Sequence, residues 1–244
     1  LKGQGLVKTI KFKTPRYLGD PINVVRIFND KEVDEIVLLD ITATPEKRGP
    51  HFEMLKNIAS EAFIPLAYGG GIRSMDDVHT LLGIGIEKLI LNTSVVENPA
   101  LVHEIADHAG SQAVVVSMDV KKNFLGKYEI FTHCGQKKTG LDPVKHAVEM
   151  EKVGAGEIFV NSIDRDGMMQ GYDIELVKKV ADAVSVPVVA CGGAGNLNDV
   201  AEVIKQGHAS AAAAGSIFVF QGPLRGVLIS YPTYQELKKL LETV

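Results

Sequence analysis

Carboxylate and amide side chains close three of the most apolar stretches of this sequence, where they could take part in proton transfer. Asp119 ends the run AVVVSMD, Asp40 ends VDEIVLLD and Asn161 ends GEIFVN. A carboxyl group that is partly removed from water has a raised pKa and can act as a general acid or base. We therefore predict that Asp119 and Asp40 are catalytic and that Asn161 contacts a ligand. Asp166, in the turn DRDG, is predicted as a further ligand contact, although bracing its own turn is the better supported role from sequence alone.

Two glycine-rich stretches stand half the chain apart and could bind phosphate. They read AYGGGIRSMDD from residue 67 and VACGGAGNLND from residue 189, and each precedes a small polar turn one strand later. Glycines after a strand let backbone N–H groups approach an anion, and a following helix directs its positive end toward it. The predicted contacts are Gly70, Gly71, Asn92 and Thr93 at one site and Gly192, Gly193, Gly215 and Ser216 at the other. Two such cradles predict an elongated ligand with phosphate at both ends, whereas tight turns alone are the alternative interpretation.

The two glycine runs belong to a longer internal repeat. The offset of 122 residues that separates Pro65 from Pro187 also separates Asp20 from Asp142, and it stays constant from residue 20 to residue 96. A register without gaps over so many positions indicates a duplication. We place the two repeats at about residues 1–121 and 122–244.

Short apolar runs alternate with helical patterns along the whole chain. Seven runs are predicted as strands, at residues 33–41, 64–68, 88–92, 113–120, 156–163, 186–191 and 209–215. Most are apolar nearly end to end, as strands buried on both faces are. Alternating units of this size favour an α/β fold, a single-domain (β/α)8 TIM barrel built from two half-barrels over residues 1–244. A doubly wound sheet is the alternative, but it gives no reason for the halving.

The repeat calls for an eighth strand before residue 10. The segment LVKTIKF, residues 6–12, is too basic for an interior strand and is predicted to be a loop. Strand one is therefore expected to be missing or truncated at the N-terminus.

Composition narrows the function classes. The 244 residues are 45% hydrophobic, carry a net charge of −4 and contain no basic block, which argues against nucleic acid as a partner. No apolar run is long enough for a membrane span, and the lone Cys134 and Cys191 suggest neither a disulfide nor a zinc site. We expect a reduced, cytoplasmic protein without a metal or cofactor. The helical histidines, among them His146, are expected on the outer surface.

Six motifs together resemble one enzyme family over about residues 1–220. They read LLDITAT, YGGGIRS, LNTSVVENP, GAGEIFVNSIDRDG, GYD and CGGAGN, and they are similar to the cyclase subunit of imidazole glycerol phosphate synthase. The resemblance implies a (β/α)8 barrel that forms a heterodimer with a glutaminase, which feeds ammonia through the barrel. It also implies a bis-phosphorylated ribotide substrate. The implied reaction, part of histidine biosynthesis, adds ammonia, closes an imidazole ring to form imidazole glycerol phosphate and releases an aminoimidazole carboxamide ribotide.

The resemblance also assigns roles to single residues. Asp119 matches the family's general acid, Lys8 the lysine of its mobile first loop, and Asp40 its mouth carboxylate. At the opposite face, three charged residues match those around the ammonia entrance; they are Glu35, Lys88 and Glu157. An ordinary ring of salt bridges that closes the bottom of the barrel is compatible with the same residues.

Departures from the family pattern leave two alternatives open. The family's second catalytic aspartate would fall just before Leu1, and Asn161 stands where the family usually has threonine. The C-terminal segment is longer and more apolar than usual, which resembles a divergent branch found beside sugar-amidation enzymes. The chain could therefore be an ammonia-channelling subunit for the amidation of a surface-polysaccharide sugar. It could also be a non-catalytic scaffold for a glutaminase.

Overall fold

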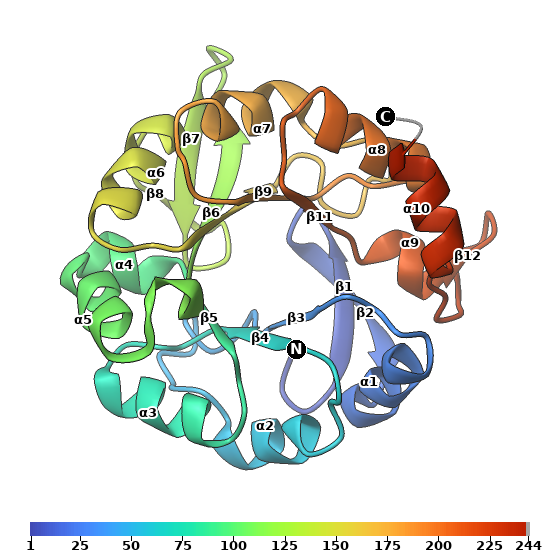
Figure 1. Cartoon of the computed structure of the whole chain (residues 1–244), viewed down its shortest axis with the longest axis horizontal. Coiled ribbons are helices and arrows are strands. Elements are labelled where there is room, and N and C mark those ends of the chain that lie inside the picture. The colour runs from blue at the N-terminus through green and yellow to red at the C-terminus, as the bar shows by residue number, and fades with distance from the viewer. Residues whose placement is uncertain (243–244) are drawn as a thin grey trace.

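The computed structural model describes residues 1–242, in which a curled parallel sheet is surrounded by helices (Figure 1). Seven parallel strands follow one another around the barrel: β3 (Ile36–Leu39), β4 (Leu66–Gly69), β5 (Lys88–Leu91), β6 (Val114–Lys122), β9 (Glu157–Ser162), β10 (Val188–Cys191) and β11 (Ala211–Ala213). Each of the seven coincides with a predicted strand to within a few residues. The predicted α/β barrel fold is confirmed.

Helices connect successive strands on the outside of the sheet. They are α1 (Pro21–Asp30), α2 (Phe52–Ala59), α3 (Met75–Gly83), α4 (Thr93–Glu97), α5 (Ala100–Ala109), the 3-10 helix η1 (Ser111–Ala113), α6 (Pro143–Lys152), α7 (Ile174–Ala181), α8 (Leu197–Lys205), α9 (Ser216–Val219) and α10 (Tyr234–Glu242). In the part of the chain that the structure describes, none of them is long and apolar enough to cross a membrane.

Residues related by the 122-residue offset perform the same structural tasks. Asp20 caps α1 and Asp142 caps α6, and in both cases proline begins the helix, where its fixed φ suits the first turn. A capping box begins α3 at Ser74, and another begins α8 at Asn196. The repeat in the sequence is thus a repeat of local hydrogen bonding.

The apolar residues divide between two layers. The larger cluster lies between the sheet and the helices. A smaller cluster fills the barrel interior, formed by the buried Ala67, Ile90, Val115, Phe159 and Val189. Alternate residues of a strand point to opposite faces, so strands apolar end to end supply both layers.

Three expectations from the sequence need correction or addition. Residues 6–12 are not a plain loop, because β1 (Leu6–Ile10) pairs antiparallel with β2 (Lys13–Gly19) in a hairpin. His146, a residue of α6, is buried rather than on the surface, and burial lowers its pKa. The end of β6 also continues into an unpredicted antiparallel extension with β7 (Tyr128–Thr132) and β8 (Lys137–Lys138).

The edges of the curled sheet are β3 and β11, and they do not pair with each other within residues 1–242. The backbone of Leu1 lies beside the end of β3, where its amino group donates to Leu39 and its carbonyl accepts from Ile41. Within the described residues no further strand pairs with the free side of either edge, and the short strands β12 (Phe220–Gln221) and β13 (Gly226–Val227) form a separate two-stranded sheet. The predicted eighth strand before residue 10 and the exact division into repeats remain predictions.

Candidate active site

The carboxyl ends of the parallel strands form one face of the barrel, here called the mouth. Asp119 on β6 lies directly opposite Asn161 on β9, and the Asn161 amide donates to Oδ1 of Asp119 at 3.2 Å. Burial raises the pKa of Asp119 to about 7, against the opposing effect of that hydrogen bond, and the nearby charge of Asp166 raises it further. A carboxyl group with this pKa can exchange a proton near neutral pH, and the role of Asp119 as a general acid stays a prediction.

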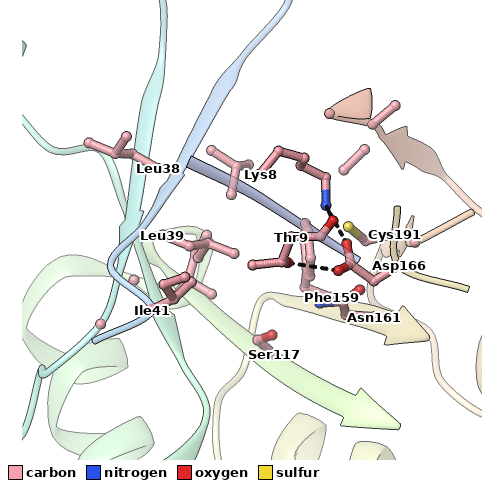
Figure 2. A pocket seen from close by; sticks show the side chains of 18 of the residues that line it. Lys8, Thr9, Leu38, Leu39, Ile41, Ser117, Phe159, Asn161, Asp166 and Cys191 are labelled. Atoms are coloured by element: carbon pink, nitrogen blue, oxygen red, sulfur yellow. Dashed lines mark hydrogen bonds and ion pairs between the residues drawn. The ribbon is translucent and has the colours of Figure 1, made fainter. Parts of the chain in front are cut away.

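Lys8 and Asp166 come together in the mouth although they lie far apart in the sequence (Figure 2). The Lys8 ammonium pairs with Oδ1 of Asp166 at 2.5 Å, and the Thr9 hydroxyl donates to Oδ2 at 2.9 Å. The Asp166 carboxylate is thus engaged by the β1–β2 hairpin. The thiol of Cys191 lies close by, and its pKa is raised to about 12, mainly by burial and secondarily by the negative charge of Asp166. The thiol is therefore neutral.

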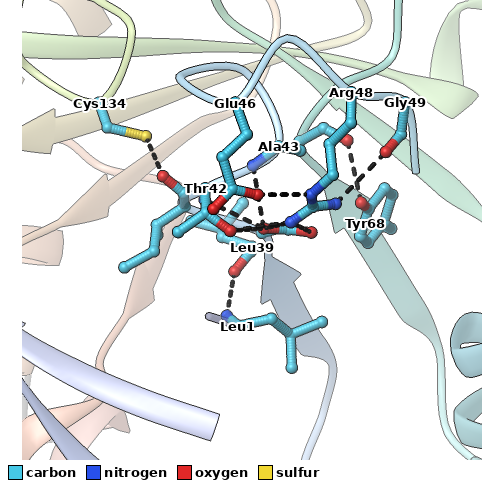
Figure 3. A network of polar contacts seen from close by, with 12 residues as sticks. Leu1, Leu39, Thr42, Ala43, Glu46, Arg48, Gly49, Tyr68 and Cys134 are labelled. Atoms are coloured by element: carbon cyan, nitrogen blue, oxygen red, sulfur yellow. Dashed lines mark hydrogen bonds and ion pairs between the residues drawn. The ribbon is translucent and has the colours of Figure 1, made fainter. Parts of the chain in front are cut away.

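Asp40 lies at the mouth but is buried within a polar network. Figure 3 shows other members of this network, among them Thr42, Ala43 and Arg48. Oδ1 of Asp40 accepts from the backbone N–H groups of Thr42 and Ala43, at 3.0 and 3.1 Å. Arg48 pairs with its Oδ2 at 2.8 Å, and the Asp40 side chain is 1% exposed. Oδ1 is committed to the turn and to Arg48, whereas Oδ2 lies within ion-pair distance of Arg48 but makes no hydrogen bond in the described residues. The bonds of Oδ1 allow Asp40 to position the loop after β3. A direct role in proton transfer remains a prediction.

Both glycine runs owe their glycines to close contacts with neighbouring loops. A Cβ on Gly70 would lie 2.5 Å from the Asp40 carbonyl oxygen, and one on Gly192 would lie 2.7 Å from that of Ser162. A Cβ on Gly193 would lie 2.1 Å from the Gly171 carbonyl oxygen, and one on Gly71 would similarly crowd the loop after β3. Packing alone therefore accounts for these glycines, and phosphate binding by their N–H groups stays a prediction.

The predicted polar turns lie at the starts of two short helices on the mouth. Asn92 precedes α4, where its amide donates to the Ser117 carbonyl at 3.0 Å, and the Thr93 hydroxyl accepts from the backbone N–H of His133 at 3.0 Å. Gly215 precedes α9, and the Ser216 Oγ is buried without a hydrogen-bond partner in the described residues. A buried hydroxyl in that state has capacity for a ligand.

A charged ring closes the opposite face of the barrel, at the amino ends of the strands. The Lys88 ammonium donates to Glu35 at 2.7 Å and to Glu157 at 3.0 Å. Burial opposes the charge on Lys88, but these two hydrogen bonds outweigh it, so its pKa is raised. The predicted trio is thus assembled as one paired cluster.

One cavity of about 1310 Å³ is lined both by this ring and by the mouth. Its lining includes Lys88 at one end, Phe159 and Ile90 in the barrel interior, and Asp119 and Ser216 at the mouth; it also extends along the seam between β3 and β11. All the predicted site residues meet this cavity or its rim. In residues 1–242, no cluster of three or more histidine, cysteine or acidic side chains could hold a metal ion.

Sequence reasoning missed two side chains that organise the mouth. Arg48 pairs with Asp40, and Thr9 with Asp166. Neither pair has a spacing typical of a local motif, although Thr9 stands directly beside the predicted Lys8. Arg48 could have been suspected because a buried carboxylate requires a partner.

Comparison with known proteins gives consistent matches over nearly the whole chain. Residues 2–224 match the family described as histidine biosynthesis protein. A protein of Pseudomonas aeruginosa PAO1, provisionally named imidazole glycerol phosphate synthase subunit hisF2, is 47% identical over 237 residues, covering 97% of this chain and 94% of the relative. A Leptospira interrogans protein provisionally named subunit HisF is 46% identical over 240 residues, covering 97% and 93%. A Vibrio vulnificus YJ016 protein provisionally named subunit hisF3 is 44% identical over 243 residues, covering 99% and 94%.

Proposed function

Because this chain belongs to the histidine biosynthesis protein family, we propose that it is the barrel subunit of an imidazole glycerol phosphate synthase. In this proposal a glutaminase subunit docks against the charged ring and supplies ammonia, and a bis-phosphorylated ribotide binds at the mouth. The products are imidazole glycerol phosphate and an aminoimidazole carboxamide ribotide. The observation that carries the proposal is the alignment along one cavity of a charged ring, an apolar interior and a half-buried carboxyl group with a raised pKa.

The proposed path of ammonia follows the barrel axis. Lys88, charged between Glu35 and Glu157, lies where ammonia would enter. Beyond this ring the interior is formed by apolar side chains such as Ile90 and Phe159. An apolar passage favours neutral ammonia over ammonium, because burying an unpaired charge is costly. Nitrogen would therefore reach the mouth in its nucleophilic form.

At the mouth, Asp119 is suited to move the protons of the reaction. With a pKa of about 7 it is present in both protonation states near neutral pH, so it can donate a proton and take one back. The Asn161 amide fixes the orientation of its carboxyl group. The turns at Thr93 and Ser216 offer donors for the two phosphates, one on each side of Asp119.

An assay with ammonium salt in place of the glutaminase tests this function. The purified chain is incubated with the bis-phosphorylated ribotide, and imidazole glycerol phosphate is quantified by mass spectrometry. Asp119→Asn keeps the size of the side chain but removes proton transfer, so the rate should fall by about 10²–10⁴-fold. Asp164→Asn, in the same mouth region, serves as the matched control. A loss below about tenfold for Asp119→Asn would place the chemistry on another group.

One observation favours a second candidate acceptor, a phosphorylated or nucleotide-linked sugar that undergoes amidation. The Asn161 Oδ1 is buried without a hydrogen-bond partner in the described residues, and this asparagine stands where the family usually has threonine. A different acceptor could supply the missing donor. If wild-type chain forms no product from the ribotide but transfers ¹⁵N from labelled ammonium to a nucleotide-linked sugar, this second function replaces the first.

A further inference from the structure

The turn of the β1–β2 hairpin has an unfavourable backbone conformation. Ile10 pairs with Lys13, so Lys11 and Phe12 form a two-residue turn, with φ of 50° and 60°. Such turns normally contain asparagine, aspartate or glycine, because other residues disfavour a positive φ. Two adjacent strained residues persist only where surrounding contacts hold them, and such strain is common in segments that move for function.

Asp166 supplies those contacts with its backbone and its side chain. Its carbonyl oxygen accepts from the backbone N–H of Lys11 at 2.9 Å, and its Oδ2 accepts from that of Phe12 at 3.3 Å. The same carboxylate holds the Thr9 hydroxyl at 2.9 Å and the Lys8 ammonium at 2.5 Å. One residue of the loop after β9 therefore binds four successive or nearly successive positions of the hairpin.

The shapes of the neighbouring loops allow this close approach. Gly167, with φ of 69°, lies so near the hairpin that a Cβ there would be 2.3 Å from the Thr9 carbonyl oxygen. Gly135 similarly makes room for the Phe12 ring, which lies 3.1 Å from the position of a Cβ. Arg225 donates to the Gly167 carbonyl at 3.1 Å and supports the loop from its other side. Three separate segments, around Gly135, Gly167 and Arg225, therefore shape the surface against which the hairpin packs.

The closed hairpin also places Lys8 beside the turn that begins α9. Carbons of the Lys8 side chain lie 3.3 and 3.4 Å from the position of a Cβ on Gly215, and the buried Ser216 Oγ follows in the chain. The Lys8 ammonium donates to Asp166 and, at 3.2 Å, to the Thr9 carbonyl. An ammonium has three N–H donors, so one remains for an anion at this turn.

We propose that Asp166 and Thr9 are positioning residues that latch the strained β1–β2 hairpin over the mouth and hold Lys8 beside Gly215 and Ser216. The latch itself is independent of the reaction, whereas the part of Lys8 in anion binding rests on the proposed function. Because the closed turn is strained, closure depends on the Asp166 bonds, and losing them releases the hairpin.

Hydrogen exchange of the hairpin tests the latch without substrate. Thr9→Val keeps the shape but removes the hydroxyl, and Asp166→Asn keeps the size but removes the charge. Hydrogen bonds to charged groups are strong, so we expect amides of residues 6–13 to exchange about tenfold faster in either variant. The controls are Thr14→Val, whose exposed threonine makes no side-chain hydrogen bond within residues 1–242, and Asp164→Asn. Exchange at the wild-type rate in both latch variants would overturn the proposal.

A rescue variant separates the latch from general damage to the fold. Lys11→Asn places at the strained turn a residue that tolerates a positive φ. Added to Asp166→Asn, it should restore part of the protection in residues 6–13 while exchange in the barrel strands stays unchanged. If the strands also exchange faster in Asp166→Asn, and Lys11→Asn restores nothing, Asp166 merely stabilises the fold and the latch is wrong.

Titration with inorganic phosphate, monitored by calorimetry, tests the positioning of Lys8. Thr9→Val should weaken binding at least about threefold, because a mobile hairpin holds the ammonium in place for less of the time. Ser216→Ala should weaken binding without changing hairpin exchange. If wild-type chain binds no phosphate, the anion site of the proposed function fails, while the exchange result still decides the latch. If Thr9→Val speeds hydrogen exchange in the hairpin but leaves the phosphate affinity unchanged, the proposed positioning of Lys8 is wrong.

Discussion

At the scale of single residues, the mouth contains carboxylates in contrasting surroundings. Asp40 is paired with Arg48 and accepts from backbone N–H groups through Oδ1, and Asp166 is engaged by the β1–β2 hairpin. Asp119 receives one amide hydrogen bond and is otherwise desolvated, which raises its pKa to about 7. Differences in partner rather than in residue type therefore separate the predicted proton donor from residues that hold loops.

The raised pKa of Asp119 has a consequence for stability. Its pKa in the folded chain, about 7, exceeds the ordinary value of 3.8, so the folded state favours the protonated form. The stability of wild-type chain should therefore fall as pH rises from about 4 to about 7, and each pKa unit corresponds to about 1.4 kcal/mol. Asp119→Asn, which cannot ionise, should be more stable than wild type at pH 8 by up to about 4 kcal/mol.

Urea unfolding at pH 5 and pH 8 measures this effect. The stability advantage of Asp119→Asn over wild type should grow between the two pH values. An equal difference from wild type at both pH values would mean that Asp119 titrates near its ordinary pKa in the folded chain.

At the scale of elements, the duplicated segments perform duplicated tasks. The capping boxes at Ser74 and Asn196 begin equivalent helices, and Gly70 and Gly192 approach the preceding strand's loop in the same manner. The glycines of both runs are required for close packing, and the same glycines are predicted to bind phosphate. The packing requirement is visible in the structure, whereas the binding role of the glycine N–H groups stays a prediction.

A pair of glycine variants separates tight packing from simple flexibility. Gly193→Ala would place a Cβ 2.1 Å from the Gly171 carbonyl oxygen at a φ of 121°, so we expect a loss of about 1–3 kcal/mol in the free energy of unfolding. Gly83→Ala, at the end of α3 with open space around it, should instead stabilise the chain by up to about 1 kcal/mol. Thermal denaturation of both variants measures the contrast, and a similar response from the two would contradict the packing argument.

At the scale of the whole molecule, the barrel separates two faces along one axis. The charged ring of Glu35, Lys88 and Glu157 lies at the amino ends of the strands, and Asp119 lies near the carboxyl ends. In the proposed function, ammonia produced at the first face reaches the second through the barrel interior. In the proposed function, the face at which nitrogen enters and the face at which it reacts can therefore be disabled independently.

Lys88→Ala tests that separation in the presence of a glutaminase partner. The variant should keep most of its activity with external ammonium, which can reach the mouth directly, but lose several-fold in the fraction of glutamine-derived nitrogen that enters product. Ser216→Ala should instead lower activity by a similar factor with either nitrogen source, because it weakens substrate binding. Product formation from ¹⁵N-ammonium and from glutamine labelled at its amide nitrogen is measured for both variants. If Lys88→Ala lost equal activity with both nitrogen sources, the lysine would only stabilise the fold at the amino ends of the strands.

Much of the fold was predictable because its signals are local. Strands buried on both faces are apolar end to end, helix starts are marked by residues such as Asp20 and Asp142, and the duplication repeats these marks at a constant offset. The sequence by itself therefore determined the barrel class, the strand positions and the ends of strands at which polar residues gather. Each of these features depends on neighbours within a few positions.

Only the tertiary structure decided which of those polar residues meet. Asp166 accepts from Lys8 and Thr9 across more than 150 positions, and Arg48 closes on Asp40 through a turn without a recognisable motif. The hairpin over residues 6–19 could not be predicted, because its turn residues, Lys11 and Phe12, oppose the conformation that Asp166 imposes. Burial is likewise a property of the packed chain. No local pattern distinguishes the desolvated carboxyl group of Asp119 from that of Asp40, which pairs with an arginine. Sequence periodicity specifies where elements form, but the partners of a side chain depend on how distant elements pack.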